Sequence, residues 1–273
     1  MNTASACRLS AAHESLLGTA PQRNGWLLIE SSGSWGARAV DEGVDPLTLS
    51  WARKNNFGCL LVRQHGRHVP AQIPAGSRSM WLSLSNGELL RAPWGTPVDD
   101  SSFTTAVPSD PMLVICTNGA RDQCCAVEGI SLRKQLVAHC APQWHPRIWE
   151  GTHIGGHRFA PTALYLPGNY VLGRLDLDAA LALVTQGLIP RPHLRGQSHF
   201  SPCHQVLCGE NADYLDIQWE DPDAACPDVT HTHWGEVDGV RRGFTIGINA
   251  LNERQESCTS EPTPGITRRL VEE

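Results

Sequence analysis

The sequence predicts an α/β protein in which two similar units follow one another along the chain. Short apolar segments typical of strands alternate with segments of helical spacing, first in residues 25–100 and again in residues 111–190. A polar stretch, residues 95–111, interrupts this pattern and is expected to be a linker. Residues 1–24 show little periodicity and are expected to be a leader. Residues 191–273 are expected to form an irregular, β-rich C-terminal extension.

In the first unit the expected order of elements is strand, helix, strand and hairpin. These elements lie at residues 26–31, 45–56, 59–64 and 80–94. Asp45 is a plausible N-cap for the helix. Leu47 and Trp51, four residues apart, are expected on its apolar face, and Leu49 adjoins that face. The hairpin is indicated by the pair Asn86-Gly87, which alternating residues flank on both sides.

The second unit repeats the pattern and adds a further helix. Its elements are expected at residues 112–117 (strand), 129–139 (helix), 147–151 (strand), 162–176 (hairpin) and 177–187 (helix). Leu132 and Leu136 lie on one face of the first helix, and Pro167-Gly168-Asn169 is the expected turn of the hairpin. In the C-terminal extension we expect strands at residues 214–220 and 243–249 and a flexible end of fifteen residues.

The composition excludes several classes of partner. The 273 residues are 41% hydrophobic and 18% charged, as in folded globular proteins, and the net charge is -6. No segment concentrates Lys and Arg, so neither nucleic acid nor an anionic membrane surface is expected as a partner. The first residues lack the pattern of a signal peptide, and no apolar run is long enough to cross a bilayer. We therefore expect a cytoplasmic protein.

The ten cysteines are then expected to be metal ligands, reactive thiols or buried thiols rather than a disulfide framework, and no C-x-x-C is present. Four Cys and His residues have the spacing of a metal site. Cys116 and Cys125 form C-x8-C, and after 27 residues His153 and His157 form H-x3-H. Two thiolates and two imidazoles suit zinc, copper or iron–sulfur chemistry.

The spacing favours an iron–sulfur cluster over zinc. Structural zinc sites bring paired cysteines two to four residues apart, so an eight-residue gap fits poorly. Gly155 and Gly156 each cost about 1 kcal/mol in a helix, so the histidine pair is expected on a loop. A [2Fe–2S] cluster is wider than one ion, and two histidines replace two cysteines on one iron of Rieske-type centres. A zinc-stabilised binding or scaffold module with the same four ligands is the alternative.

Two segments, CTNGARDQCC and WEGTHIGGHRFAPTALYLPGNYVLGRL, resemble the sucrase/ferredoxin-like family of thioredoxin-like ferredoxins. That family carries C-x8-C followed by H-x-G-G-H. The matching residues are Cys116, Gly119, Arg121, Asp122 and Cys125, then His153, Gly155, Gly156, His157, Arg158, Phe159 and Ala160. LLGTAP and WLLIESSGSWG extend the similarity to roughly residues 16–200. The chain departs from the family at Asn118, where His is frequent, but this position is not one of the four family ligands.

The resemblance implies a thioredoxin-like ferredoxin domain at residues 111–190, preceded by a unit without a cluster. It implies that Cys116 and Cys125 hold one iron of a [2Fe–2S] cluster and that His153 and His157 hold the other, redox-active iron. Exchanging two thiolates for neutral imidazoles removes negative charge, so the potential should exceed that of all-cysteine plant-type ferredoxins. The remaining imidazole N–H groups should couple electron transfer to protons.

The expected function is therefore electron transfer, with a redox protein or a small-molecule acceptor as partner and no catalytic residues. A reductase role is the weaker possibility. No paired-carboxylate pattern supports the word sucrase in the family name.

The remaining cysteines and charged neighbours carry weaker expectations. Cys124 is expected to be a buried neighbour of a ligand; a thiol oxidoreductase acting through Cys124 and Cys125 is disfavoured because C-x-x-C is missing. Arg121 and Asp122 are expected to form a local ion pair, and Arg158 to favour the reduced state by its charge or to contact an anionic partner. The extension holds residues with passable metal spacing, but we expect them to be scattered: Cys203, His204, Cys208, Cys226, His231 and His233.

Overall fold

The computed structural model describes residues 7, 11–64, 78–96, 98, 106–210, 218–219, 226–237, 239–257 and 260–272. Its strands are β1 (Gly25–Glu30), β2 (Phe57–Arg63), β3 (Ser79–Leu84), β4 (Leu89–Pro93), β5 (Val107–Pro108), β6 (Met112–Cys116), β7 (Ile148–Gly151), β8 (Ala163–Leu166), β9 (Tyr170–Leu172), β10 (Leu194–Gln197), β11 (Gln218–Trp219), β12 (His231–Val237), β13 (Val240–Gln255) and β14 (Pro262–Glu272). The helices are α2 (Ala39–Gly43), α3 (Pro46–Lys54), α4 (Ile130–His139), α5 (Leu177–Gln186) and α6 (Pro202–Glu210), with short helical turns η4 (Cys125–Gly129), η5 (Pro142–Arg147), η6 (His157–Phe159) and η7 (Arg191–His193).

The α/β architecture rests on one ten-stranded sheet with two halves of the same topology. The strand order is β10-β9-β8-β6-β7-β2-β1-β3-β4-β5. In the first half β1 is parallel to β2, and β3, β4 and β5 add antiparallel strands. In the second half β6 is parallel to β7, and β8, β9 and β10 add antiparallel strands. The halves join through antiparallel pairing of β2 with β7, where Val62 faces Gly151.

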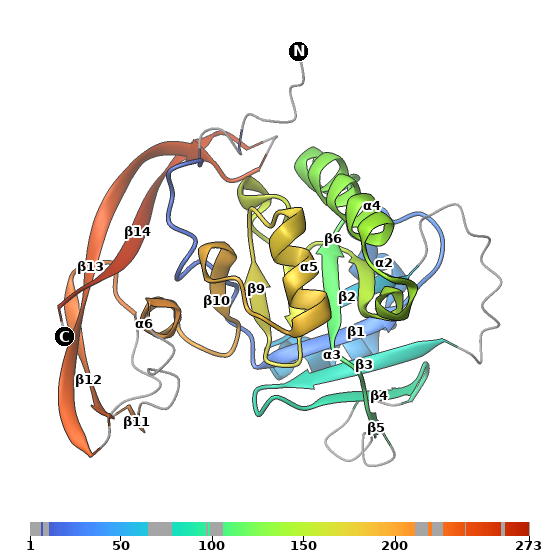
Figure 1. Ribbon diagram of the computed structural model, residues 1–273, viewed down its shortest axis with the longest axis horizontal. Coiled ribbons are helices and arrows are strands. Elements are labelled where there is room, and N and C mark those ends of the chain that lie inside the picture. The colour runs from blue at the N-terminus through green and yellow to red at the C-terminus, as the bar shows by residue number, and fades with distance from the viewer. Residues whose placement is uncertain are drawn as a thin grey trace.

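Helices cover one face of each half because successive strand residues point to opposite faces. Leu113 and Ile115 of β6 pack with α4 and α5, which lie next to each other in Figure 1. Leu27 and Ile29 of β1 pack in the same way against α2 and α3.

The two remaining sheet faces share a core, so the sheet curls on itself. Trp26 of β1 and Val114 of β6 belong to the same buried cluster. Trp81 of the first half meets Trp149 of the second half edge-on, with ring centroids 4.9 Å apart. Cys116 and Cys125 also lie in this shared core, which places the predicted site at the contact of the two halves.

A second sheet, β11-β12-β13-β14, is antiparallel and lies to one side of the curled sheet (Figure 1). The helix α6 lies between the two sheets in that view. Its core with the second sheet is small, consisting of the buried residues Cys203, Val206, Leu207, Phe244 and Ile246. This region has little buried apolar surface with which to stabilise itself.

The turn and cap signals of the sequence are confirmed. Gly87 adopts a left-handed φ of 85° in the turn between β3 and β4. The Asp45 side chain accepts a hydrogen bond from the Thr48 amide (2.9 Å), as expected of an N-cap. Gly187, with φ 72°, ends α5.

The predicted apolar face of α3 is confirmed at Leu49 and Trp51, which pack in the core of the first half, and is wrong at Leu47. Leu47 is 83% exposed, and Leu49 and Ala52 are buried. The helix begins at Pro46, so Leu47 lies in its first turn, and the spacing that faces the sheet is 49 and 52.

The N-terminal segment is irregular as expected, but it is packed into the protein. Glu14, Leu16 and Ala20 are buried, and the Ala20 amide donates to Gln205 Oε1 of α6 (3.1 Å). In the predicted linker, residues 97 and 99–105 lie outside the described residues, while Val107–Pro108 forms the edge strand β5.

The expectation of a flexible C-terminus is wrong. Residues of the last fifteen form β14, which pairs antiparallel with β13. Its Pro and Gly residues hide the strand signal, because such residues are depleted in strands. Of the predicted strand 214–220, only Gln218 and Trp219 lie within the described residues, as β11.

Candidate metal-binding site

The cysteine loop begins where β6 ends, at Cys116, and returns to it at Cys125. The amides of Arg121 and Asp122 both donate to the carbonyl of Asn118 (3.2 Å each), which closes the turn. The helix after Cys125 approaches β6 so closely that a Cβ on Gly129 would lie 2.0 Å from the Cys116 carbonyl oxygen. Glycine at this position therefore allows the two cysteines to meet.

Asp122 braces this loop through a backbone hydrogen bond, and its predicted ion pair with Arg121 stays a prediction. Its Oδ1 accepts from the Cys124 amide (2.9 Å), and its Oδ2 lies 3.8 Å from His157 Nδ1. Arg121 is exposed. The carboxylate of Asp122 therefore links the cysteine loop to the histidine loop.

The histidine loop begins where β7 ends, at Gly151. Thr152 ties it to the first half of the sheet: its amide donates to the Leu61 carbonyl (3.0 Å), and its hydroxyl accepts from the Leu61 amide (3.1 Å). Gly155 and Gly156 both have left-handed φ values, 101° and 76°, which glycine adopts without strain. The pair is on a loop, as predicted.

The four predicted ligands come together in a ring of neighbours. Cys116 neighbours Cys125 and His153, and both of them act on its pKa. Cys125 Sγ lies 3.5 Å from His157 Nδ1, and the rings of His157 and His153 stack with centroids 4.1 Å apart. The cysteines are thus adjacent to each other, and so are the histidines.

Metal binding requires thiolates and neutral imidazoles, and the pKa shifts of Cys116 and His157, but not that of Cys125, favour these states. The hydrogen bond from Cys125 lowers the pKa of Cys116 well below its usual value, although burial raises it. The same bond, with burial, raises the pKa of Cys125. Burial and the neighbouring His153 lower the pKa of His157 to about 4, so its imidazole is neutral near pH 7.

One buried nitrogen atom in the ring of four residues makes no hydrogen bond to the described residues. His153 Nδ1 is inaccessible to solvent and has no hydrogen-bond partner among the described residues. Such atoms are uncommon in folded proteins unless they have a specific role. Together with two cysteines that form no disulfide, it gives a donor set of two sulfurs and two nitrogens that fits a metal or an iron–sulfur cluster.

Comparison with known proteins gives the family. Residues 16–196, more than half of the chain, match the family model described as sucrase/ferredoxin-like. The chain belongs to this family. A curated relative, "Altered inheritance of mitochondria protein 32" from Meyerozyma guilliermondii, is 32% identical over 98 residues, which are 32% of this chain and 35% of the relative. The match thus spans about a third of that relative's length. No solved structure gives a significant match.

In this sucrase/ferredoxin-like chain the two sides of the ring differ in burial. Cys116 and Cys125 are each 1% exposed, and His157 is 8% exposed. His153, Gly155 and Gly156 are only half-buried. The histidine side is therefore the one that lies near the surface.

Arg195, from β10, supports the histidine loop of this family member, and sequence reasoning missed it. Its Nη1 donates to the Gly155 carbonyl (2.8 Å) and its Nε to the Thr19 hydroxyl (3.0 Å). A Cβ on Gly156 would lie 2.6 Å from Arg195 Nη2. Burial and the charge of Arg158 lower the pKa of Arg195 to about 9, so it is still a cation at pH 7. No local pattern marks this residue, which follows the motif by 38 positions.

Arg158 is paired inside the protein, which corrects the expectation that it contacts an anionic partner. It is buried, and its Nε and Nη2 each donate to Glu14 over 2.8 Å. Arg254 of β13 donates to the same carboxylate (2.6 and 3.1 Å), and Glu256 pairs with both arginines. This buried network connects the N-terminal segment, the histidine loop and the second sheet.

A cavity of about 490 Å³ adjoins the cysteine loop, where Thr117 and Asn118 line it. Glu150 in its wall accepts two hydrogen bonds from Arg63 (2.9 and 2.8 Å) and pairs with Arg133 (3.1 Å). Lys134 also lines it and is exposed. The cavity therefore has a positive rim.

Cys124 is the buried neighbour that the sequence predicts. It is fully buried, and its Sγ lies 3.2 Å from Cys7 Sγ. Cys7, Asp122 and Cys124 have ligand atoms within 4.8 Å of one another.

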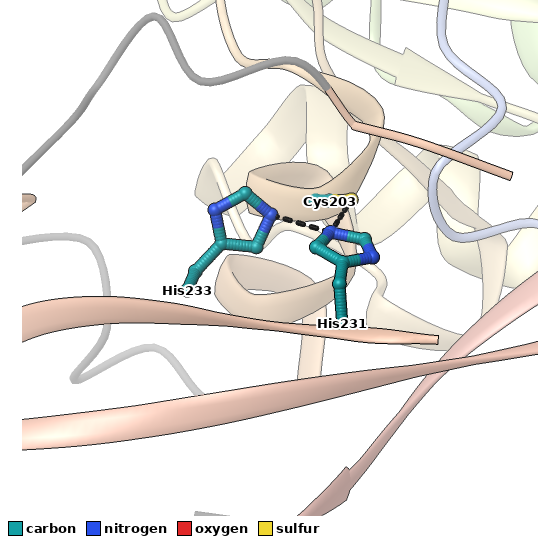
Figure 2. A group of neighbouring side chains, drawn as sticks. All are labelled: Cys203, His231 and His233. Atoms are coloured by element: carbon teal, nitrogen blue, oxygen red, sulfur yellow. Dashed lines mark hydrogen bonds between the residues drawn. The ribbon is translucent and has the colours of Figure 1, made fainter. Parts of the chain in front are cut away.

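Four of the six residues of the C-terminal extension that we expected to be scattered gather at one place. Cys203 and Cys226 form a disulfide, and Cys203, His231 and His233 converge (Figure 2). Cys208 lies elsewhere, in the wall of a small pocket beside Tyr170. The sequence could not place this group, because its members come from α6, a loop and β12.

Proposed function

We propose that this protein transfers electrons through one [2Fe–2S] cluster bound by Cys116, Cys125, His153 and His157. The observation that carries the proposal is the order of the ring: the two sulfur ligands are neighbours and the two nitrogen ligands are neighbours. This order matches a cluster with two cysteines on one iron and two histidines on the other. The sucrase/ferredoxin-like family model covers all four residues.

We propose that the surrounding unit, residues 111–190, is a thioredoxin-like domain. Support comes from its topology, in which two parallel strands joined by a helix, β6-α4-β7, are followed by the β8-β9 hairpin and α5. The first half of the sheet repeats the strand order, but only Cys59 lies in its strands. It would support the site through the Leu61–Thr152 hydrogen bonds without binding a cluster itself.

The chain's own residues set the conditions of electron transfer. When bound, the cluster would supply a one-electron redox couple with a potential above that of all-cysteine plant-type ferredoxins. The buried cysteine side excludes water, and the half-buried His153 provides the shortest route to a partner at the surface. The ring nitrogen of each histidine that does not bind metal holds a proton, which couples electron transfer to pH.

The partner is a redox protein or a small-molecule acceptor. A protein would approach His153, while the positive rim formed by Arg133 and Lys134 suits a small anion beside the cysteine loop. The structure contains no helix, among its described residues, that is long and apolar enough to cross a membrane. The cytoplasmic location expected from the sequence stays a prediction.

The test is the metal content and visible spectrum of protein purified without oxygen. We expect about two irons and two sulfides per chain and a coloured protein. The Cys116→Ser variant should lose the iron, the sulfide and the colour. The matched control is Cys59→Ser, which changes a cysteine of the other half and should retain all three. A colourless, zinc-loaded protein would favour the alternative, a zinc-stabilised binding module, and would contradict electron transfer.

The histidines are tested by changing the ligand type without removing it. His153→Cys and His157→Cys should each keep a cluster but lower its potential, because a thiolate adds negative charge. Both variants should also weaken the dependence of the potential on pH, measured by protein-film voltammetry. Unchanged potentials in both variants would exclude the histidines as ligands.

A further inference from the structure

The convergent group in the C-terminal region combines Cys and His side chains from three segments. Cys203 lies in the first turn of α6, Cys226 lies in the chain before β12, and His231 and His233 lie on β12. Residues two apart on a strand point to the same face, so both imidazoles face α6. Figure 2 shows the two rings and Cys203 pointing toward one another.

The donor atoms are close enough to share one ion. His231 Nε2 lies 3.3 Å from Cys203 Sγ and 2.7 Å from His233 Nε2. The donor atoms of these three residues all lie within 4.8 Å of one another. The Cα atoms of Cys203 and Cys226 are 5.6 Å apart, so the second sulfur belongs to the same group.

The hydrogen bonding of His231 prepares one ring nitrogen for a metal. Its Nδ1 lies 2.7 Å from the carbonyl oxygen of Val229, which can only accept, so Nδ1 carries the proton. The neutral ring then presents the lone pair of Nε2 to Cys203 and His233. This is the arrangement by which a backbone carbonyl orients a metal-binding histidine.

The surroundings suit a neutral, closed site. Cys203 is fully buried with Phe244 and Ile246, and His233 is 7% exposed. Two thiolates balance the charge of Zn²⁺, so the complex could be buried there without an uncompensated charge. Because the core between α6 and the second sheet is small, a cross-link there would add to the stability of the contact between the helix and the strands.

We propose that Cys203, Cys226, His231 and His233 bind a structural Zn²⁺ when the cysteines are reduced, and that their disulfide is the metal-free oxidised state of the same site. A dithiol reductant breaks the S–S bond, gives both protons and both electrons to the two sulfurs, and itself becomes a disulfide. Zn²⁺ then displaces the two thiol protons as the two Zn–S bonds form. The disulfide joins α6 to the segment before β12, and the zinc site would join α6 to β12 as well.

The experiment measures zinc and iron together in the full chain, reduced with a dithiol, loaded with Zn²⁺ alone and desalted. We expect about one zinc per chain, with an X-ray absorption spectrum of two sulfur and two nitrogen neighbours. His231→Ala combined with His233→Ala should reduce zinc about tenfold or more and leave iron unchanged. His199→Ala, a half-buried histidine outside the group, is the matched control and should retain zinc.

A crossed variant separates this site from the one proposed for the cluster, which has the same donor types. Cys116→Ser should remove iron and leave zinc in place. If zinc disappears in Cys116→Ser and persists in the His231/His233 variant, the zinc site is wrong, whatever the iron content shows. Loss of iron binding in the wild type would overturn the cluster without affecting this test.

A measurement on the wild type keeps the proposal testable if the histidine variants fail to fold. In the reduced, zinc-loaded protein, Cys203 and Cys226 should resist alkylation, and a chelator should make both reactive, as followed by peptide mass spectrometry. Equal labelling with and without the chelator would overturn the proposal. So would a disulfide that persists in the presence of the dithiol.

Discussion

The two Cys/His groups of this protein have the same donor types but are held in different ways. In the first, the donors come from two loops that follow neighbouring parallel strands, β6 and β7, and form a ring of pairs. In the second, donors from α6 and β12 converge within 4.8 Å. The ring suits a cluster of two irons, and the convergent group suits a single ion. Under the two proposals, the backbone that holds the side chains, and not the residue types alone, decides which metal chemistry each site takes.

The groups also differ in what holds their backbone. The first depends on Gly155 and Gly156, on Arg195 and on contacts between both halves of the large sheet. The second depends on a carbonyl beside His231 and on a few apolar residues. One buried carboxylate connects them: Glu14 binds Arg158, next to a ligand of the first group, and Arg254, on the strand that pairs with β12.

The largest effect is expected from breaking this connection. Glu14→Gln leaves Arg158 and Arg254 buried with less negative charge to compensate them, which should lower the free energy of unfolding by about 3–5 kcal/mol. Urea unfolding at pH 7 measures this free energy. The control is Glu253→Gln, because Glu253 is an exposed neighbour of Arg254. Equal stability of the two variants would show that the network contributes nothing.

The same network predicts a pH dependence. Burial alone would raise the pKa of Glu14, but hydrogen bonds from Arg158 and Arg254 outweigh it and lower that pKa. The stabilisation is therefore present above the ordinary carboxyl pKa and is lost as the pH falls through the lowered value. The wild type should lose stability in this acidic range more steeply than Glu14→Gln.

A smaller and more local effect is expected from removing zinc. In the reduced protein, a chelator should lower the stability of the region around α6 and β12 by about 2–4 kcal/mol, comparable with the loss of a structural cross-link. Hydrogen exchange should accelerate in β12 and β13 and remain unchanged in β6 and β7. Acceleration spread over both sheets would mean that the two groups are not independent.

The smallest effect is expected at the glycines of the histidine loop. In Gly155→Ala the added Cβ has no atom within 4 Å, so the variant should lose only about 1–2 kcal/mol of folding free energy to left-handed backbone strain. Gly156→Ala adds a clash with Arg195 and should also reduce iron content. If iron retention is equal in the two variants, Arg195 does not position the loop.

The sequence predicted the parts of the fold that local patterns encode. Apolar runs marked β1 and β6, the Asn86-Gly87 pair marked a hairpin, and the spacing of Cys116, Cys125, His153 and His157 marked the ring. The curl of the sheet stayed hidden, because alternating apolar residues do not reveal that two inner faces share one core.

Contacts between residues far apart in the chain could not be predicted from the sequence either. Glu14 and Arg195 lie far from the motif along the chain, and no local pattern pairs them with it. The residues of the second Cys/His group were named from the sequence but expected to be scattered, because 22 residues separate Cys203 from Cys226 and only the fold brings them together.

The most direct test of the central claim is the Mössbauer spectrum of the protein grown with ⁵⁷Fe and purified without oxygen. Two irons with different ligands, one held by Cys116 and Cys125 and the other by His153 and His157, should give two quadrupole doublets of equal area and unequal isomer shift. A single doublet typical of all-sulfur coordination, or a protein that holds zinc and no iron at these residues, would contradict the account.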